Sequence, residues 1–146
     1  MTLIIRPLVS ADEAMWRQLW CGYLDYYETE LSDEIYVSAF SRMLSDDHPE
    51  YHGLVAELDG KLVGLTHYIF HTHGWQLADV CYLQDLYADP TVRGKGIGRA
   101  LIEGVYAAAD VAGCPSVYWM TQDFNKTARV LYDRIGQLTP FIKYSR

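Results

Sequence analysis

The chain has 146 residues, 50% hydrophobic and 14% aromatic, and its 12 Lys and Arg against 19 Asp and Glu give a formal charge of −7. These figures exclude a disordered chain and predict a core that buries about two thirds of the unfolded surface. No apolar run approaches the ~20 residues of a membrane span, and the N-terminal segment lacks the order of a secretory signal. We expect a single domain over residues 1–146, cytoplasmic and with no membrane partner.

The first half of the chain predicts a strand, two helices and a hairpin. Residues 3–9 alternate like a strand, and Ser10 with Glu13 three residues later forms a capping box that opens a helix. Ser32 is expected to cap a second helix that ends near Leu44. Apolar runs over 53–58 and 61–70 flank Asp59-Gly60, the dipeptide that favours a two-residue hairpin turn.

The second half predicts a strand, a turn and a helix, followed by shorter elements. The strand over 80–88 stops at Asp89-Pro90, because proline cannot extend a ladder. A glycine-rich turn then leads into a helix. The expected elements after the turn are a helix over 98–112, a buried strand over 116–121, a helix over 125–135 ended by Gly136, and a last strand over 138–144. Together, the expected strands and helices predict a mixed α/β fold built on one sheet.

Charge is unevenly distributed along the chain. Residues 1–73 hold twelve acidic and four basic side chains, whereas residues 74–146 hold seven acidic and eight basic ones. Between residues 25 and 50, eight carboxylates face only one base, Arg42. A nucleic acid partner is excluded, because a phosphate backbone requires a basic stripe. The acidic segment is either a solvated face or a surface that attracts a cation.

The turn over residues 92–99 has the properties of an anion site. It precedes a helix, where several backbone N–H groups have no partner within the helix. Three glycines allow a sharp turn and close approach, while Arg93, Lys95 and Arg99 add positive charge. The turn matches neither a Walker A loop nor the dinucleotide pattern. A pyrophosphate is the anion that we expect here.

This turn resembles the acyl-CoA loop of the GCN5-related N-acetyltransferase (GNAT) family, Arg/Gln-x-x-Gly-x-Gly/Ala, as Arg93-x-x-Gly96-x-Gly98. Two linked motifs share the family's spacing, one over residues 83–90 and one from Asn125 to Gly136. The aromatic pattern over 16–28, with Trp75 and residues 116–119, is also similar to the yeast polyamine and histone acetyltransferase branch. The resemblance implies the GNAT fold, a mixed and mostly antiparallel central sheet with flanking helices, in which the parallel strands 80–88 and 116–121 splay apart.

By the same resemblance, acetyl-CoA is the co-substrate, and its pantetheine arm lies between the splayed strands as a pseudo-strand. Asn125 is expected to bond the arm from the other side, although its position equally fits a helix N-cap. The residues that the resemblance assigns to acetyl-CoA are Leu86, Tyr87, Ala88, Arg93, Gly94, Lys95, Gly96, Ile97, Gly98, Arg99 and Asn125.

Transfer to an amine requires a base and a stabilised leaving thiolate. At pH 7 the neutral form of an alkylamine with a pKa of about 10.4 lies roughly 4.6 kcal/mol above its charged form. Asp85 is the first candidate base, and Glu28 the second; a purely structural carboxylate that bonds loop amides is the alternative for Asp85. The family places a tyrosine at Tyr132, which we expect to donate a hydrogen bond to the departing sulfur, with a core tyrosine as the alternative.

The acceptor is predicted to be a primary amine on a small cationic molecule, such as a polyamine, or on a basic peptide. Asp25, Tyr27 and Glu28 are the candidate acceptor residues, because aromatic rings beside carboxylates wall a cation pocket. The alternatives are an amino acid, a protein N-terminus, or a sensor that binds acyl-CoA without turnover.

Several other signals point to structure or assembly. His67, His71 and His73 share parity on a strand, but the roughly 20 Å between the first and the last is too far for one ion, so no metal is expected. The three cysteines are interpreted as reduced thiols, with Cys81 buried. The expected last strand invites pairing with a second copy, which predicts a homodimer.

Overall fold

The computed structural model describes residues 2–92 and 94–146, so the predicted role of Arg93 lies outside the described residues. Within these residues, no helix is both long and apolar enough to cross a bilayer. In chain order the elements are β1 (Leu3–Pro7), η1 (Ser10–Asp12), α1 (Glu13–Tyr26), α2 (Asp33–Leu44), β2 (Tyr51–Leu58), β3 (Lys61–His71), β4 (Val80–Ala88), η2 (Pro90–Val92), α3 (Ile97–Val111), β5 (Val117–Tyr118) and α4 (Lys126–Ile135).

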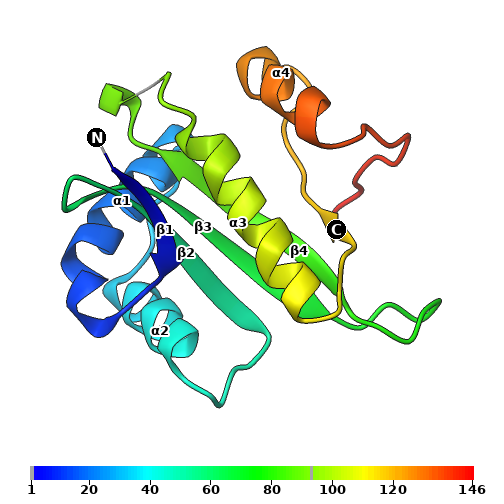
Figure 1. Cartoon of the computed structure of the whole chain (residues 1–146), viewed down its shortest axis with the longest axis horizontal. Coiled ribbons are helices and arrows are strands. Elements are labelled where there is room, and N and C mark those ends of the chain that lie inside the picture. Colours follow the sequence, from blue (N-terminus) through cyan, green and yellow to red (C-terminus); the bar gives the residue numbers. More distant parts are fainter. Residues whose placement is uncertain (1, 93) are drawn as a thin grey trace.

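The strands form one sheet in the order β1-β2-β3-β4-β5, and helices cover both faces (Figure 1). The first four strands are antiparallel to their neighbours, whereas β4 and β5 are parallel. The helices α1 and α2 pack on one face, and α3 on the other, where α4 also packs. The predicted mixed, mostly antiparallel sheet is therefore confirmed.

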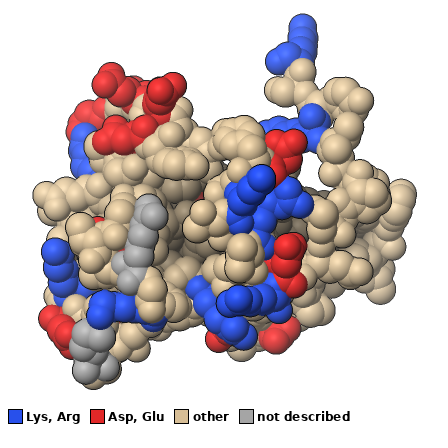
Figure 2. Space-filling model, turned by 90° about the horizontal axis from the view of Figure 1, so that it is seen from above, with Lys and Arg blue, Asp and Glu red and all other residues tan. Residues whose placement is uncertain are grey.

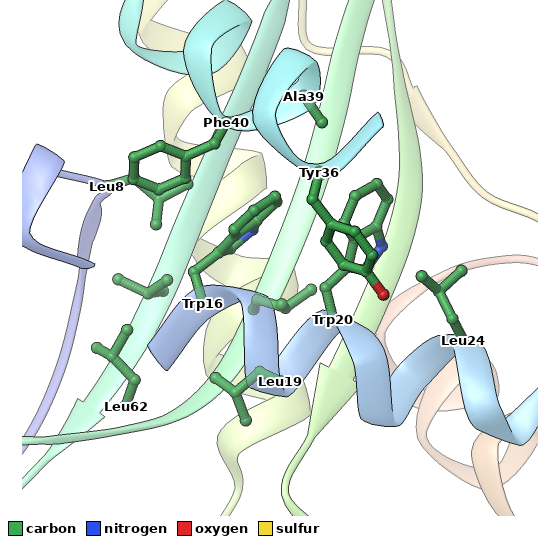
Figure 3. Packing of buried hydrophobic residues seen from close by; sticks show 11 residues of the cluster. Leu8, Trp16, Leu19, Trp20, Leu24, Tyr36, Ala39, Phe40 and Leu62 are labelled. Carbon is green, nitrogen blue, oxygen red and sulfur yellow. The ribbon is translucent and has the colours of Figure 1, made fainter. Parts of the chain in front are cut away.

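Aromatic residues dominate the core between the sheet and the α1/α2 layer (Figure 3). Trp16 is fully buried at its centre, with ring centroids 5.0 Å from Phe40 and 5.2 Å from Trp20. One helical turn apart on α1, Tyr23 and Tyr27 continue this stripe away from the core, half-buried and exposed respectively. The first part of the stripe stabilises the fold, and the last part reaches the surface.

The hairpin and the proline stop form as predicted. Asp59 and Gly60 connect β2 to β3 with φ of 51° and 82°, the left-handed pair that matches the twist of a two-residue hairpin. The strand β4 ends at Ala88, directly before Asp89-Pro90. Both features depend on a few neighbouring residues, which is why the sequence predicts them.

The parallel strands β4 and β5 pair over only two positions, Cys81 with Val117 and Tyr82 with Tyr118. Beyond them, β5 pairs with no further residue of β4 among the described residues, as expected for splayed strands. The strand predicted over 116–121 is correspondingly shorter than expected.

Two predictions of local structure are wrong, and a third is confirmed only in part. Ser10 does not cap α1; instead, the Asp12 carboxylate accepts a bond from the Val9 N–H at 2.8 Å. Ser32 is the N-cap residue of α2, which ends at Leu44 as predicted, but its side chain makes no capping bond. Residues 138–144 form no strand, because the described residues offer this segment no neighbouring strand and Pro140 lacks an N–H.

Candidate active site

A β-bulge turns Asp85 towards α1. In the β3–β4 ladder, His67 pairs with Asp85 and Tyr68 pairs with Leu83, so Gln84 is the extra residue. The bulge breaks the alternation of faces, since Leu83 packs in the α3 layer while Asp85 bonds a histidine next to α1. The hydroxyl of Thr66 donates to the carbonyl of Asp85 at 2.8 Å and so satisfies a backbone acceptor beside the bulge.

Asp85 is buried and bonded to a histidine, not to loop amides. Its Oδ2 lies 2.7 Å from Nδ1 of His67, and the indole Nε1–H of Trp16 donates to Nε2 of His67 at 2.9 Å. Because an indole N–H can only donate, Nε2 carries the lone pair and Nδ1 carries the hydrogen that Asp85 accepts. Sequence reasoning considered His67 as a metal ligand, an edge-strand polar residue or an acceptor contact, but not as the partner of Asp85. The signal that it missed is the chain order of β3 and β4, which are consecutive strands and pair antiparallel.

Tyrosines from α1 and β4 lie between Asp85 and the surface. Burial first, and then the nearby Asp85 carboxylate, raise the pKa of Tyr23, to which Tyr27 also contributes. The Tyr23 ring is 5.1 Å from that of Tyr27 and 6.2 Å from that of Tyr87. Tyr23 was not among the candidate acceptor residues named from the sequence, and its position beside Asp85 makes it part of the candidate site.

The helix α4 contributes Tyr132 to the same region. The ring of Tyr132 packs 5.5 Å from that of Trp119, and burial first, with Tyr27 second, raises the pKa of its phenol. The structure therefore brings Tyr27 and Tyr132 together, although 105 positions separate them. Asp25 and Glu28 are exposed near the end of the same helix α1, and Glu28 takes a φ of 53°.

The glycine-rich turn provides a cradle before α3. Gly94 and Gly96 have φ of 79° and 72°, the left-handed region where other residues are strained, and a Cβ on either would meet nothing within 4 Å. Ile97 is buried and anchors the first turn of α3, where backbone N–H groups lack helical partners. This open cradle fits the diphosphate of acetyl-CoA.

The polar side chains around the turn differ in their exposure and in their partners. Lys95 is exposed, whereas the Nε of Arg99 pairs with Glu103 at 2.7 Å on α3, so its charge is partly offset. Asn125 caps α4, since its Oδ1 accepts from the Ala128 N–H at 3.5 Å. The N-cap alternative for Asn125 is therefore confirmed, while its contact with a bound arm stays a prediction.

The histidines on and after β3 each have a different hydrogen-bond partner. His71 contacts the hydroxyl of Tyr118 at 2.7 Å, and Nδ1 of His73 accepts from the N–H of Trp75. In residues 2–92 and 94–146, no three His, Cys, Asp or Glu side chains are grouped to hold a metal ion. Cys81 is buried, as predicted, and burial raises the pKa of its thiol to about 11.

Known proteins resemble this chain in sequence and in fold. The acetyltransferase (GNAT) family model matches residues 13–137. D-amino-acid N-acetyltransferase HPA3 of Saccharomyces cerevisiae is 32% identical over 145 residues, which cover 99% of this chain and 90% of that protein. Thialysine N-epsilon-acetyltransferase of Bos taurus is 33% identical over 117 residues, covering 73% and 68% of the two chains.

Among solved structures, AAC(6')-Iy in complex with the bisubstrate analogue CoA-S-monomethyl-acetylneamine superposes with a TM-score of 0.86. The sequences are 18% identical, and the match covers 100% of this chain and 98% of that one. From the family match and the relatives that carry the same activity name, the chain belongs to the GNAT family and is an N-acetyltransferase that acts on an amine.

Proposed function

We propose that this chain forms a single domain over residues 1–146 that transfers an acetyl group from acetyl-CoA directly to a primary amine on a small cationic acceptor, such as a polyamine, or on a basic peptide. The observation that carries the proposal is the convergence of α1, β4 and α4: a buried carboxylate, Asp85, lies behind tyrosines at the open edge of β4. The glycine cradle begins at Gly94, six positions after Ala88 at the end of β4. Amine, thioester and diphosphate thus have adjoining sites.

The cradle and the open strand edge have the chemistry that acetyl-CoA requires. The N–H groups of the turn from Gly94 to Gly98 and the start of α3 attract the diphosphate, with Lys95 adding charge. The backbone of Leu86, Tyr87 and Ala88 at the end of β4, beyond the two residues that β5 pairs with, is proposed to recognise the amides of the pantetheine arm. When bound, acetyl-CoA supplies the thioester that the amine attacks.

Tyr132 is proposed as the hydrogen-bond donor to the departing sulfur. Its phenol has a pKa raised by burial, so it stays protonated throughout the neutral range and remains a donor. The same shift makes full proton transfer to a thiolate less favourable, because an ordinary thiol near 8.5 is already the stronger acid. We therefore assign Tyr132 a hydrogen bond that strengthens as charge develops on sulfur.

Replacing Tyr132 with Phe should lower kcat by about 10- to 100-fold with little change in acetyl-CoA affinity, because only the developing charge loses its partner. Stopped-flow measurement of thiol release, with calorimetry of CoA binding, checks this expectation. The exposed Tyr144→Phe is the matched control. A Tyr132→Phe variant that releases thiol at the wild-type rate would contradict the role.

The acceptor is proposed to be cationic because of the acidic side of the molecule. Asp25, Glu28, Glu30, Asp33 and Glu34 are all exposed, and Figure 2 shows acidic side chains gathered at one edge of the face. The exposed ring of Tyr27 lies between this region and Tyr132. Carboxylates beside an aromatic ring favour an ammonium group.

An amino acid is the second candidate acceptor, favoured by the D-amino-acid N-acetyltransferase among the relatives. Purified chain, acetyl-CoA and a thiol reagent separate the candidates when the panel contains diamines, polyamines, lysine-rich peptides, and D- and L-amino acids. Turnover with polyamines or basic peptides supports the cationic acceptor. Turnover with amino acids alone would replace it, and CoA binding with no turnover would indicate a sensor.

We also propose a homodimer and a cytoplasmic location. Residues 137–146 expose Leu138, Phe141, Ile142 and Tyr144, and β5 leaves one edge open within the described sheet. Pairing of this segment with a second copy would cover both features. Light scattering should show twice the chain mass, and a monomer at micromolar concentration would contradict the dimer. The unpaired Cys21, Cys81 and Cys114 suit a reducing compartment.

A further inference from the structure

Four side chains connect the core to the candidate site. Trp16 donates to His67 at 2.9 Å, and His67 lies 2.7 Å from Asp85. The next group is the phenol of Tyr23, which is close enough to the Asp85 carboxylate for that charge to raise its pKa, and whose ring lies 5.1 Å from that of Tyr27. Trp16 and His67 are fully buried and Asp85 is 6% exposed, whereas Tyr23 is half-buried. The series therefore runs from dry core to accessible site.

The direction of each hydrogen bond in this series is assigned by starting from Trp16, the residue at its buried end. The indole of Trp16 is a donor only, so Nε2 of His67 accepts and Nδ1–H donates to Asp85. A carboxylate only accepts. Burial first, and then the Asp85 carboxylate, raise the pKa of Tyr23, so this phenol keeps its proton and Asp85 is a nearby group that can accept it. The oxygen of Tyr23, which Tyr27 also adjoins, has lone pairs that can accept a hydrogen from the site.

We propose that Tyr23 is the group that takes the proton from the acceptor ammonium, passing its own proton to Asp85, while His67 and Trp16 act as positioning residues. This inference rests on the proposed function. In the step, an N–H bond of the ammonium breaks and an O–H bond forms on Tyr23. The original Tyr23 O–H bond breaks and an O–H bond forms on Asp85. Ammonium and carboxylate become amine and carboxylic acid, and Tyr23 is neutral before and after.

The other groups that face Asp85 and Tyr23 do not replace Asp85 as the final proton acceptor. Tyr51 on β2 and Tyr82 on β4 both have a pKa raised first by burial and further by Asp85, so they stay protonated. The charged neighbour beyond Tyr51 is Arg42, which cannot accept a proton. Tyr36 on α2 packs edge-on to Trp16, and burial raises its pKa as well. On α1 and β4, Tyr27 and Tyr87 are the flanking phenols.

The hydrogen-bond direction can be tested without activity. In protein labelled with ¹⁵N-histidine, long-range ¹H–¹⁵N spectra at pH 7.5 should show His67 as the neutral tautomer with hydrogen on Nδ1. Trp16→Phe should release this constraint and change the tautomer signal. A His67 that carries its hydrogen on Nε2 in the wild-type chain would overturn the proposal. This readout holds even if no amine is acetylated, so it fails separately from the proposed function.

The relay itself is tested by the pH profile of Tyr23→Phe. At pH 7, kcat/KM for the best amine should fall about 100-fold or more. The kcat/KM of Tyr23→Phe should then rise about tenfold per pH unit towards the pKa of the amine, because only the free amine reacts. The pH profile of the wild-type chain should be flatter. Tyr26→Phe, exposed on the same helix, is the matched control and should keep the wild-type profile.

Circular dichroism and CoA calorimetry confirm that each variant is folded. If Tyr23→Phe does not fold, Asp85→Asn provides the second test, because it removes the final proton acceptor and should show the same steep profile. A folded Tyr23→Phe or Asp85→Asn with the wild-type profile would overturn the relay.

Discussion

Asp12 is a buried carboxylate that holds the end of β1 and the start of α1 together. It is 3% exposed and accepts from Arg6 at 2.8 and 3.0 Å and from the backbone N–H of Val9. The Arg6 hydrogen bond first, opposed in part by burial, lowers the pKa of Asp12 below its ordinary value. A single side chain thus replaces the capping box expected at Ser10.

Replacing Asp12 with Ala should lower the free energy of unfolding by about 2–3 kcal/mol, because Arg6 and the Val9 N–H lose a shared partner. Glu57→Ala, which removes the half-exposed partner of Arg6, is the control and should cost about 1 kcal/mol or less. Urea titration of both variants gives the comparison. Equal losses would contradict a special role for Asp12.

The hydrogen-bonded pair of Arg6 and Asp12 predicts that the free energy of unfolding depends on pH. Since the folded pKa of Asp12 lies below its unfolded value near 3.9, the charged carboxylate stabilises the fold fully above about pH 5. That contribution disappears as the pH falls through the lower, folded pKa. Urea titrations should therefore show the gap between wild type and Asp12→Ala closing in strong acid, and a constant gap down to pH 2 would rule this out.

At the scale of elements, α3 packs closely against β3 at Gly64. A Cβ at this position would lie 2.8 Å from Cγ2 of Ile97, 3.0 Å from the carbonyl oxygen of Tyr87 and 3.1 Å from Cδ1 of Leu101. These contacts couple the start of α3, and so the glycine cradle, to both central strands. The sequence alone does not indicate this requirement, because a glycine inside a strand has several explanations.

Gly64→Ala is expected to reduce stability by about 1–3 kcal/mol through overpacking, and to weaken CoA binding by displacing the first turn of α3. Thermal unfolding and calorimetry measure the two effects. Gly74→Ala adds the same methyl group where nothing lies within 4 Å, and should leave both unchanged. A fully stable Gly64→Ala with wild-type affinity would show that the sheet tolerates the methyl group.

For the whole molecule, the division of charge predicts salt-dependent capture of the acceptor. The first 73 residues carry a formal charge of −8 and the remaining 73 a charge of +1. Raising NaCl from 20 to 300 mM shortens the Debye length several-fold and should lower kcat/KM for a diamine by about 3- to 10-fold. A zwitterionic amino acid is the control and should change little. A diamine rate independent of salt would argue against electrostatic capture.

The elements that sequence analysis predicted well are those whose cause lies within a few residues. Asp59-Gly60 takes the turn that its backbone preferences favour, Pro90 ends β4, and Asn125 caps α4. The Gly94–Gly98 turn was predicted for the same reason, since glycines at these positions permit left-handed backbone before a helix. The family motifs depend on these local features, so they also predicted the fold.

Only the tertiary structure determines which residues from distant segments of the chain come into contact. The strict alternation of β4 would place Leu83 and Asp85 on one face, yet the bulge at Gln84 sends them to opposite layers. No spacing in the sequence predicts that Asp85 contacts His67, or that Tyr27 lies near Tyr132. Strand register and helix packing set the distances between these residues. Likewise, the alternation of residues 138–144 specifies a possible strand, but a ladder forms only where a partner supplies the other half of its hydrogen bonds.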